Sequence, residues 1–387
     1  MTQRLRTAYI TGAGAFLPGA PVGNDAMEPY LGQVHGRASS LGRRALRWNG
    51  IETRHYALSP DGSHQHSGAS MCAAAIRAAA ESAGEGLGAL DLLATATTQG
   101  DLLVPGHGVQ VQAELGVGPL EVASFQSVCA SALMAAKTAW LNIRAGEADN
   151  AVAAASEFSS RWFRPEFYDG SDLIDAKGRL PMQADFLRWT LSDGAGAVWM
   201  QAAPSRDHVS LRVDWIDMVS LAHQYDSCMW AGAAPGQAHD LSRSWSAAGP
   251  RAAFQAGAIA LMQDFTLLKT IIRAWIGEYL KKVDSGRIVP DQVDRLLLHY
   301  SARSLREEII GLLESTGGMI DEERWFNNLK TRGNTGSASI WIMLEELFAR
   351  GDIAAGERIL CIVPESGRAM VGFMHLTAIA PDKETRP

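Results

Sequence analysis

The feature of this chain that most constrains its fold is an alternation of short apolar runs with helix-forming segments, which occurs twice. In the first half the apolar runs lie at residues 7–17, 90–98, 122–125, 150–156 and 191–200. In the second half they lie at residues 208–219, 295–299, 358–363 and 369–379. Strands that alternate with helices favour right-handed crossovers and helices layered on a sheet. The sequence therefore predicts a duplicated, layered α/β fold, with halves at 1–205 and 206–387.

Three segments between these runs carry predictions of their own. Residues 41–56 contain the turn Asn49-Gly50 followed by a basic-aromatic stretch, which is typical of a surface hairpin. Residues 158–190 are irregular and rich in aromatic side chains, so we expect an inserted cap over a pocket, although aromatics under a long loop are also plain packing. Residues 252–282 have apolar positions three and four apart, which predicts one long helix.

Composition places the chain among ordinary globular proteins. It has 387 residues, 47% hydrophobic and 20% charged, with a formal net charge of −7, which argues against general nucleic-acid binding. Its four cysteines show no metal-binding spacing, which fits a reducing compartment. The start of the chain lacks the apolar core of a signal peptide, and no apolar run approaches the roughly 18 residues of a membrane span. We expect a cytoplasmic protein with no membrane partner.

Two short motifs suggest ligand sites that the sequence does not otherwise support. Gly12-Ala-Gly14 follows a strand, but Leu17 stands where a dinucleotide-binding motif needs its third glycine, and Pro18 follows instead of a helix. His64 and His66 have the spacing of a possible metal pair, yet no Cys or acidic residue clusters with them. A polar start to the helix predicted at 67–82 is the favoured interpretation, and no metal site is predicted.

Cys129 is the first candidate catalytic residue. It follows a strand-like run and a polar break at Gln126-Ser127, and it opens a segment of strong helix propensity that ends near Gly146. Orphan N–H groups and the positive end of the helix dipole favour the thiolate at such a position. The alternative is a small buried hydrophobe, as most free cysteines are.

His299 and Asn334 are the second and third candidates. His299 ends an apolar strand, where ligands of open α/β sheets meet side chains, although a structural histidine is the more common case. Asn334 lies between glycines in a turn and could be a left-handed or helix-capping residue. A thiol, an imidazole and a carboxamide in these positions together favour catalysis, and the nucleophile-elbow, Walker A and HExxH motifs are absent.

At these residues the chain resembles the β-ketoacyl-acyl-carrier-protein synthase III branch of the thiolase-like condensing enzymes, over essentially its whole length. The matching stretches are Asn49-Gly-Ile-Glu-Thr-Arg-His-Tyr-Ala57, Ser127-Val-Cys129-Ala-Ser-Ala, Leu191-Ser-Asp-Gly-Ala-Gly-Ala197, Leu298-His299-Tyr-Ser and Gly333-Asn334-Thr-Gly-Ser-Ala-Ser339. Finer features are similar to the subgroup that forms dialkylresorcinols or cyclohexanediones. They are Val104-Pro-Gly-His107, Phe186-Leu-Arg-Trp-Thr-Leu-Ser-Asp193, Cys228-Met229, Arg324-Trp-Phe326 and Pro364-Glu-Ser-Gly-Arg368.

The resemblance implies a duplicated αβαβα five-layered fold, a homodimer and transfer of an acyl group onto Cys129. It implies that His299 and Asn334 hydrogen-bond the thioester carbonyl of the donor and stabilise enolate charge. The backbone N–H groups of Cys129 and Gly367 would form a second oxyanion hole. Val104 would lie on a loop that reaches the partner subunit's acyl pocket.

The chain also departs from the family pattern. Ala302 stands where the family commonly has an asparagine three residues after the histidine, and Arg44 and Trp48 only roughly match the positions that grip coenzyme A. A substrate bound to acyl carrier protein is therefore favoured over acyl-coenzyme A, with no permanently bound cofactor. The donor is either a malonyl or a 3-oxoacyl thioester, and Glu157 or Glu365 is either a base for the latter or a structural carboxylate.

Three functions remain open at the level of sequence. The first is Claisen-type carbon–carbon bond formation in fatty-acid or polyketide-type specialised metabolism. The second is an acyltransferase that forms an ester or amide from the acyl group on Cys129. The third is a non-catalytic partner of a sister ketosynthase, against which the retention of Cys129, His299 and Asn334 argues.

Overall fold

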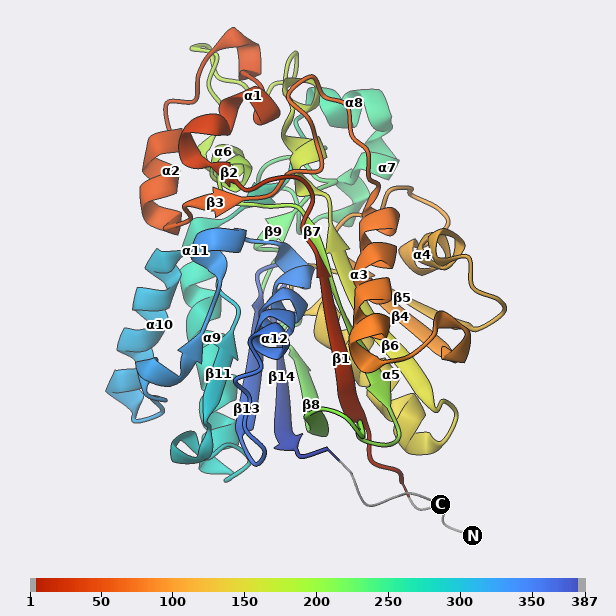
Figure 1. The fold of residues 1–387 in the computed structure, drawn as a ribbon. Coiled ribbons are helices and arrows are strands. Elements are labelled where there is room, and N and C mark those ends of the chain that lie inside the picture. The colour runs from red at the N-terminus through yellow and green to blue at the C-terminus, as the bar shows by residue number, and fades with distance from the viewer. Residues whose placement is uncertain (1–4, 382–387) are drawn as a thin grey trace.

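The computed structural model, which describes residues 5–381, is built on one continuous ten-stranded sheet (Figure 1). The strand order is β12-β11-β13-β14-β8-β1-β7-β6-β4-β5. The bounds of these strands are β1 Tyr9–Phe16, β4 Leu92–Thr97, β5 Glu121–Gln126, β6 Asn150–Glu157, β7 Gly194–Gln201, β8 Ser210–Ser220, β11 Arg295–Leu298, β12 Trp325–Phe326, β13 Arg358–Glu365 and β14 Met370–Ile379. Two short pairs, β2 (Val22–Gly23) with β3 (Thr53–Arg54) and β9 (Met229–Trp230) with β10 (Met262–Gln263), lie outside it.

The two halves of the sheet share one topology. Counted along the chain within each half, the strands stand in the order third, second, fourth, fifth, first, both in β5-β4-β6-β7-β1 and in β12-β11-β13-β14-β8. The first three positions pair in parallel and the rest antiparallel in both halves. The halves meet where β1 pairs with β8 through Tyr9↔Arg212 and Ile10↔Leu211.

Helices cover the sheet in layers, which confirms the predicted fold class. The long helices are α3 Gly68–Ala83, α4 His107–Leu115, α5 Ser131–Ala145, α9 Phe265–Asp284, α10 Arg303–Thr316 and α12 Ser339–Arg350. Apolar side chains of α5 and α12 share one core cluster with strands of both halves. A second cluster joins α3 and α4 to the first half, and a third joins α9 and α10 to the second half. The layers are therefore α, β, α, β and α, with α5 and α12 between the two half-sheets.

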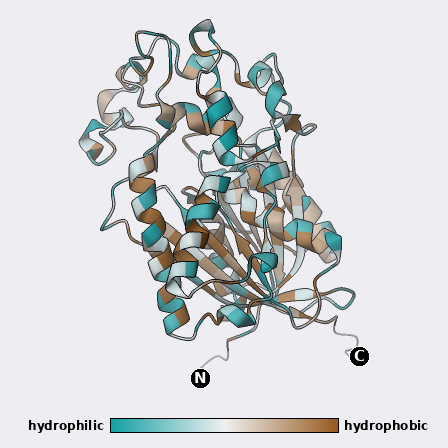
Figure 2. Cartoon of the chain, turned by 90° about the vertical axis from the view of Figure 1, so that its left-hand side faces the viewer, coloured by the Kyte–Doolittle hydropathy of each residue, from teal (hydrophilic) through white to brown (hydrophobic). Residues whose placement is uncertain are grey.

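The hydropathy of the chain follows this layering. Figure 2 shows hydrophobic residues gathered on the strands and on the helix faces turned toward them. Shorter helices lie mostly in the connecting segments: α1 Glu28–Leu31, α2 Gly42–Asn49, α6 Met182–Arg188, α7 Trp245–Ala248, α8 Pro250–Gln255 and α11 Leu329–Arg332. No helix among residues 5–381 is both long enough and apolar enough to span a membrane.

Close packing of β1 against α3 explains why glycines occur at positions 12 and 14. A Cβ added at Gly12 would lie 2.4 Å from the carbonyl oxygen of Ala79, and one at Gly14 would lie 2.3 Å from the nitrogen of Ala79. Real Cβ atoms do not approach backbone atoms so closely, so these glycines let β1 lie directly against α3. The pair therefore serves the contact between a strand and a helix.

Two of the local predictions were wrong. The single helix expected at 252–282 is broken into α8 and α9, because Gly257 takes a left-handed φ of +71° and the Asp264 side chain caps a new helix at Thr266 and Leu267. The surface hairpin expected at 41–56 contains the helix α2, and Arg54, His55 and Tyr56 are buried. The predicted helix at 67–82 is confirmed as α3, with Ser67 as its N-cap.

Candidate active site

Cys129 lies in the turn that joins β5 to α5. The helix begins at Ser131 with Ala130 as its N-cap, so the thiol precedes the first turn instead of lying within it. The Ser131 N–H donates to Val128 O at 3.3 Å, which closes this turn. The Cys129 side chain is buried, because the turn is folded between the two half-sheets under the irregular segments.

His299 directly follows β11 and is fixed through its backbone. Its N–H donates to Ile362 O on β13 at 3.0 Å, which continues the strand pairing one residue past the strand. The residue is buried, and desolvation lowers the pKa of its imidazole to about 4, so the ring is neutral near pH 7. Neither ring nitrogen is hydrogen-bonded to another of residues 5–381.

Asn334 is oriented by a tight turn. Gly333 has φ +74°, and a Cβ there would lie 2.8 Å from Ser192 Cβ, so this position needs glycine. The carbonyl of Asn334 accepts from Ser192 N at 2.8 Å, and its side-chain Oδ1 accepts from Gly336 N at 3.0 Å. The amide Nδ2 then has no partner among the described residues and is available as a donor.

These three side chains line one cavity. Its walls come from both halves, with Cys129, Glu157 and Phe158 from the first and His299 and Asn334 from the second. The space, its mouth included, measures about 1150 Å³. Residues of the segment at 158–190 also line it, namely Ser159, Phe186, Leu187 and Thr190, so part of the expected cap forms a wall of this cavity.

The electrostatics of Cys129 differ from the sequence-based expectation. Burial raises the pKa of the thiol well above its ordinary value, and the negative charges of Glu365 and Glu157 raise it further. The expectation that the helix start favours a resting thiolate is therefore wrong, because desolvation and two carboxylates raise the pKa of the thiol. The resting site pairs a neutral thiol with a neutral imidazole.

Glu157 and Glu365 are buried carboxylates held by hydrogen bonds. Glu157 accepts from Thr98 Oγ1 at 2.8 Å and from Ser337 N at 3.1 Å, while Glu365 accepts from Ser127 Oγ at 2.6 Å and from Ala130 N at 3.1 Å. Burial raises the pKa of both. Glu157 is among the residues that line the cavity, and Glu365 lies behind Cys129 at the start of α5.

The other predicted site residues have varied positions. Gly367 lies in the turn after β13, close enough to the Cys129 turn that an added Cβ would meet Val128 Cγ2 at 3.1 Å. Trp48 is 41% exposed and lines the cavity, whereas Arg44 stacks over Trp48 outside it. Val104 is 81% exposed and does not line the cavity of its own chain.

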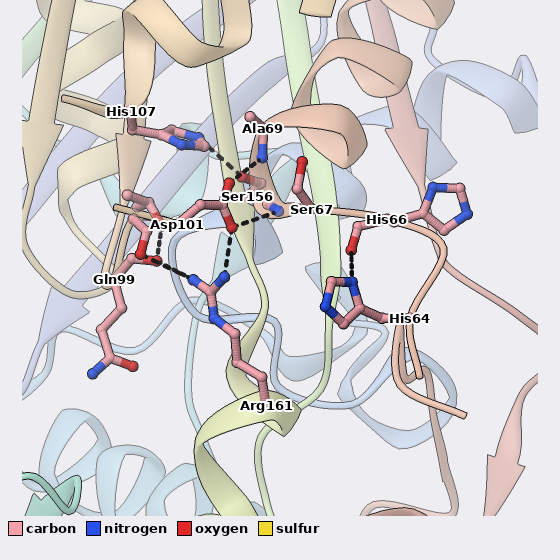
Figure 3. Close-up of polar contacts among 12 residues, drawn as sticks. His64, His66, Ser67, Ala69, Gln99, Asp101, His107, Ser156 and Arg161 are labelled. Carbon is pink, nitrogen blue, oxygen red and sulfur yellow. Dashed lines mark hydrogen bonds and ion pairs between the residues drawn. The ribbon is translucent and has the colours of Figure 1, made fainter. Parts of the chain in front are cut away.

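A partly buried polar cluster anchors the loop that carries Val104 (Figure 3). Asp101 accepts from Gly68 N and Ala69 N at 2.9 Å each, at the start of α3, and forms an ion pair with Arg161 at 2.5 Å. His107, on the other side of the loop, contacts Ser156 Oγ at 3.0 Å. His64 and His66 do not converge, since a ring nitrogen of His64 bonds the backbone oxygen of His66.

Comparison with known proteins identifies the architecture of this site. The model for the C-terminal part of 3-oxoacyl-[acyl-carrier-protein] synthase III matches residues 284–373, which include His299 and Asn334. The model for the N-terminal domain of β-ketoacyl synthase matches residues 121–203, which include Cys129. The chain is 25% identical over 356 residues to the β-ketoacyl-[acyl-carrier-protein] synthase III of Methylococcus capsulatus, with 92% of this chain and 94% of that protein covered.

Both halves of the chain are similar to the β-ketoacyl-acyl-carrier-protein synthase III-like condensing enzymes. Solved structures agree on the thiolase-like fold. The tetronic acid condensing enzyme AbyA1 superposes with a TM-score of 0.74 at 20% identity, covering 96% of this chain and 99% of that one. The 3-oxoacyl-[acyl-carrier-protein] synthase III of Aquifex aeolicus superposes with a TM-score of 0.69 at 20% identity and the same coverage. The finer resemblance to resorcinol-forming enzymes stays a prediction.

Sequence reasoning left the roles of the two carboxylates open and missed most of the cavity wall from α9 and α10. The parallel between Ala153-Ala-Ala-Ser-Glu157 and Cys361-Ile-Val-Pro-Glu365 was a usable signal for the carboxylates. The wall residues Leu268, Ile272, Trp275 and Ile309 carry no motif. They have the ordinary helical spacing of core residues, so only their three-dimensional position identifies them.

Proposed function

We propose that this synthase III-like protein accepts an acyl group from a thioester onto Cys129 and joins it to a second thioester through a new carbon–carbon bond. The observation that carries the proposal is the single cavity lined by Cys129, His299 and Asn334, which come from two halves of the chain. A nucleophile and two hydrogen-bonding side chains that share one cavity can act on one pair of substrates.

The first step is acyl transfer. As Cys129 Sγ attacks the thioester carbon, its proton passes to the neutral imidazole of His299, and the carrier thiolate that leaves takes this proton. His299 is neutral near pH 7, so one of its ring nitrogens carries the lone pair that would accept this proton. The backbone N–H groups of Cys129 and Gly367 would bind the oxyanion, since neither donates to another residue within 5–381.

The second step forms the new bond. A malonyl donor loses carbon dioxide and keeps the electron pair as a carbanion, whereas a 3-oxoacyl donor loses its C2 proton to a base. The carbanion then attacks the acyl carbon, and the Cys129 sulfur leaves as a thiolate, which takes a proton back from the base in the 3-oxoacyl case or from water in the malonyl case. Asn334 Nδ2 and His299 would stabilise the enolate oxygen, and Glu157 would be the carboxylate that accepts a C2 proton, a role supported by its position in the cavity wall.

An acyl carrier protein is the proposed partner that brings the thioester. Helix α2 exposes Arg43, Arg44 and Arg47 and has no acidic residue, beside the mouth residue Trp48. A chain with net charge −7 thus has a cluster of cations at the cavity mouth, which suits an anionic carrier with a phosphorylated arm. We also propose a homodimer, whose interface would bury the exposed apolar loop at Leu102, Leu103 and Val104. A cytoplasmic location stays a prediction.

The test is intact mass after incubation with a panel of acyl-carrier-protein thioesters, followed by addition of a labelled donor. We expect an acyl adduct on the wild type, none on Cys129→Ala, and a product with a new carbon–carbon bond. Asn334→Ala should still acylate but condense about 100-fold more slowly, which is the usual effect of losing one oxyanion donor. An adduct whose acyl group passes only to oxygen or nitrogen nucleophiles would indicate an ester- or amide-forming acyltransferase. The absence of any adduct would instead favour the hypothesis of a non-catalytic partner.

A further inference from the structure

Gln263 is a polar residue in the wall of the active-site cavity to which the proposed reaction gives no role. It lies on β10, is 5% exposed and lines the cavity together with the apolar side chains of Met229 and Leu261. A buried carboxamide loses its hydration, and hydrogen bonds to protein groups must offset that cost. The partners of Gln263 therefore indicate what this side chain does.

The carboxamide of Gln263 links two segments that are distant in the chain. Its Nε2 donates to Cys228 Sγ at 3.1 Å and to Cys228 O at 3.4 Å, directly before β9. Its Oε1 accepts from Ser366 Oγ at 3.5 Å, in the turn after β13. The pairing of β9 with β10 places Gln263 opposite Met229, so the carboxamide lies between this strand pair and the turn.

The next residue of the turn, Gly367, is held through its backbone by the same strand pair. Its carbonyl accepts from Cys228 N at 2.8 Å. A Cβ added at Gly367 would lie 2.8 Å from Glu365 Oε1, so the position needs glycine, whose backbone is the least restricted of all. The orientation of its peptide groups therefore depends on outside contacts, which are Cys228 on one side and the Ser366 side chain held by Gln263 on the other.

We infer that Gln263 is a positioning residue for the oxyanion hole. By holding the two segments around the turn, it aims the Gly367 N–H at the oxygen of the thioester. This inference rests on the proposed acyl transfer to Cys129. A donor that is displaced slightly binds the developing negative charge less well, while binding of the uncharged substrate changes little. Loss of Gln263 should therefore lower the rate of the chemical step and leave the affinity for the thioester unchanged.

The first test is single-turnover acylation of Cys129 by octanoyl-acyl carrier protein, followed by intact mass. Gln263→Met keeps the length of the side chain and removes both polar atoms. We expect its maximal acylation rate to fall about tenfold, with an unchanged half-saturating concentration of the thioester. Gln255→Met, at an exposed glutamine, is the matched control and should behave like the wild type. An unchanged maximal rate with a raised half-saturating concentration would overturn the inference, because it would indicate direct contact with the substrate.

A second variant tests whether the hydrogen bonds themselves matter. In Gln263→Glu the introduced carboxyl has both a donor and an acceptor while it is protonated, and it loses the donor when it ionises. Burial favours the protonated form. The acylation rate of Gln263→Glu, divided by that of the wild type at the same pH, should therefore approach one near pH 5, whereas the same ratio for Gln263→Met stays low. A proton cannot repair a merely structural defect, so an equally low ratio for both variants near pH 5 would overturn the inference.

Hydrogen exchange tests the contacts without any activity. The Cys228 N–H, which donates to Gly367 O, should exchange about tenfold faster in Gln263→Met than in the wild type, as measured by mass spectrometry of peptides that contain it. Gln255→Met should show no change. If exchange accelerates but octanoyl-acyl carrier protein does not acylate the wild type, the proposed function fails and the contacts of Gln263 stand. If exchange at Cys228 is unchanged, the positioning role fails whatever the activity.

Discussion

Glu157 and Glu365 occupy equivalent positions at the ends of β6 and β13. Each carboxylate accepts a hydrogen bond at the start of a helix from the other half, α12 for Glu157 and α5 for Glu365. Glu157 accepts from the backbone N–H of Ser337, just before α12, and Glu365 accepts from that of Ala130, just before α5. Two duplicated halves are thus tied by a reciprocal pair of buried hydrogen-bond clusters. The same pair places two negative charges near Cys129, and both raise the pKa of its thiol.

Glu365→Gln is expected to make Cys129 more reactive. Removing the carboxylate removes a charge that disfavours the thiolate, so the thiol pKa falls and more thiolate is present at a given pH. The rate of iodoacetamide alkylation, measured by intact mass between pH 7 and 10, should rise several-fold at pH 8. Glu323→Gln, at an exposed position, is the control and should leave the profile unchanged. An unchanged profile in Glu365→Gln would show that Glu365 does not set this pKa.

Asp101→Ala is expected to destabilise the protein. The Asp101 carboxylate caps two N–H groups of α3 and pairs with the partly buried Arg161, and its removal leaves these groups without partners. Loss of such a cap costs about 1–2 kcal/mol of unfolding free energy, measured by urea denaturation. Asp61→Ala removes an exposed carboxylate 40 residues earlier in the chain and should cost much less.

Val104→Asp is expected to convert a dimer into a monomer. Leu102, Leu103 and Val104 are 54%, 82% and 81% exposed on a loop whose base is anchored, and a charge there would have to be desolvated in any interface. Light scattering after size-exclusion chromatography at micromolar concentration measures the change. Val289→Asp, at an exposed valine remote in the chain, is the control. A monomeric wild type would contradict the dimer proposal.

The free energy of unfolding is expected to fall as the pH is lowered, and the buried neutral His299 should contribute to this fall. The pKa of His299 is about 4 in the folded protein and about 6.5 when unfolded. The unfolded chain therefore binds more protons between these values, and the stabilisation, complete above pH 6.5, is lost as the pH falls toward 4. Between pH 7 and pH 5 the loss is about 2 kcal/mol. Urea unfolding of His299→Gln should show a drop smaller by that amount, and an equal drop would refute a neutral buried His299.

Gly14→Ala is expected to destabilise the contact between β1 and α3. The new methyl group would lie 2.3 Å from a backbone nitrogen of α3, which cannot move aside like a flexible side chain. Overpacking of this kind costs about 1–3 kcal/mol or more, measured as a shift in the urea midpoint. Gly23→Ala is the control, since nothing lies within 4 Å of its added Cβ and its φ is −74°.

The sequence by itself determined the alternating elements, the duplicated topology and the three side chains that share the cavity. These features are local: apolar runs fix strands, the glycines around Asn334 fix a turn, and Cys129 and His299 each follow a strand end. The ends of strands in a layered sheet meet at one edge, so residues placed there converge without further information.

Only the tertiary structure decided the protonation of Cys129, the break at Gly257 and Asp264, the burial of Arg54 and the part of the cavity wall that α9 and α10 supply. Each depends on groups distant in the chain, as when Glu365 lies against a thiol 236 residues before it. Local propensity carries no record of desolvation or of charges brought in by folding. A cavity is likewise a property of how helices pack on a sheet, and its apolar lining looks in sequence like any other core.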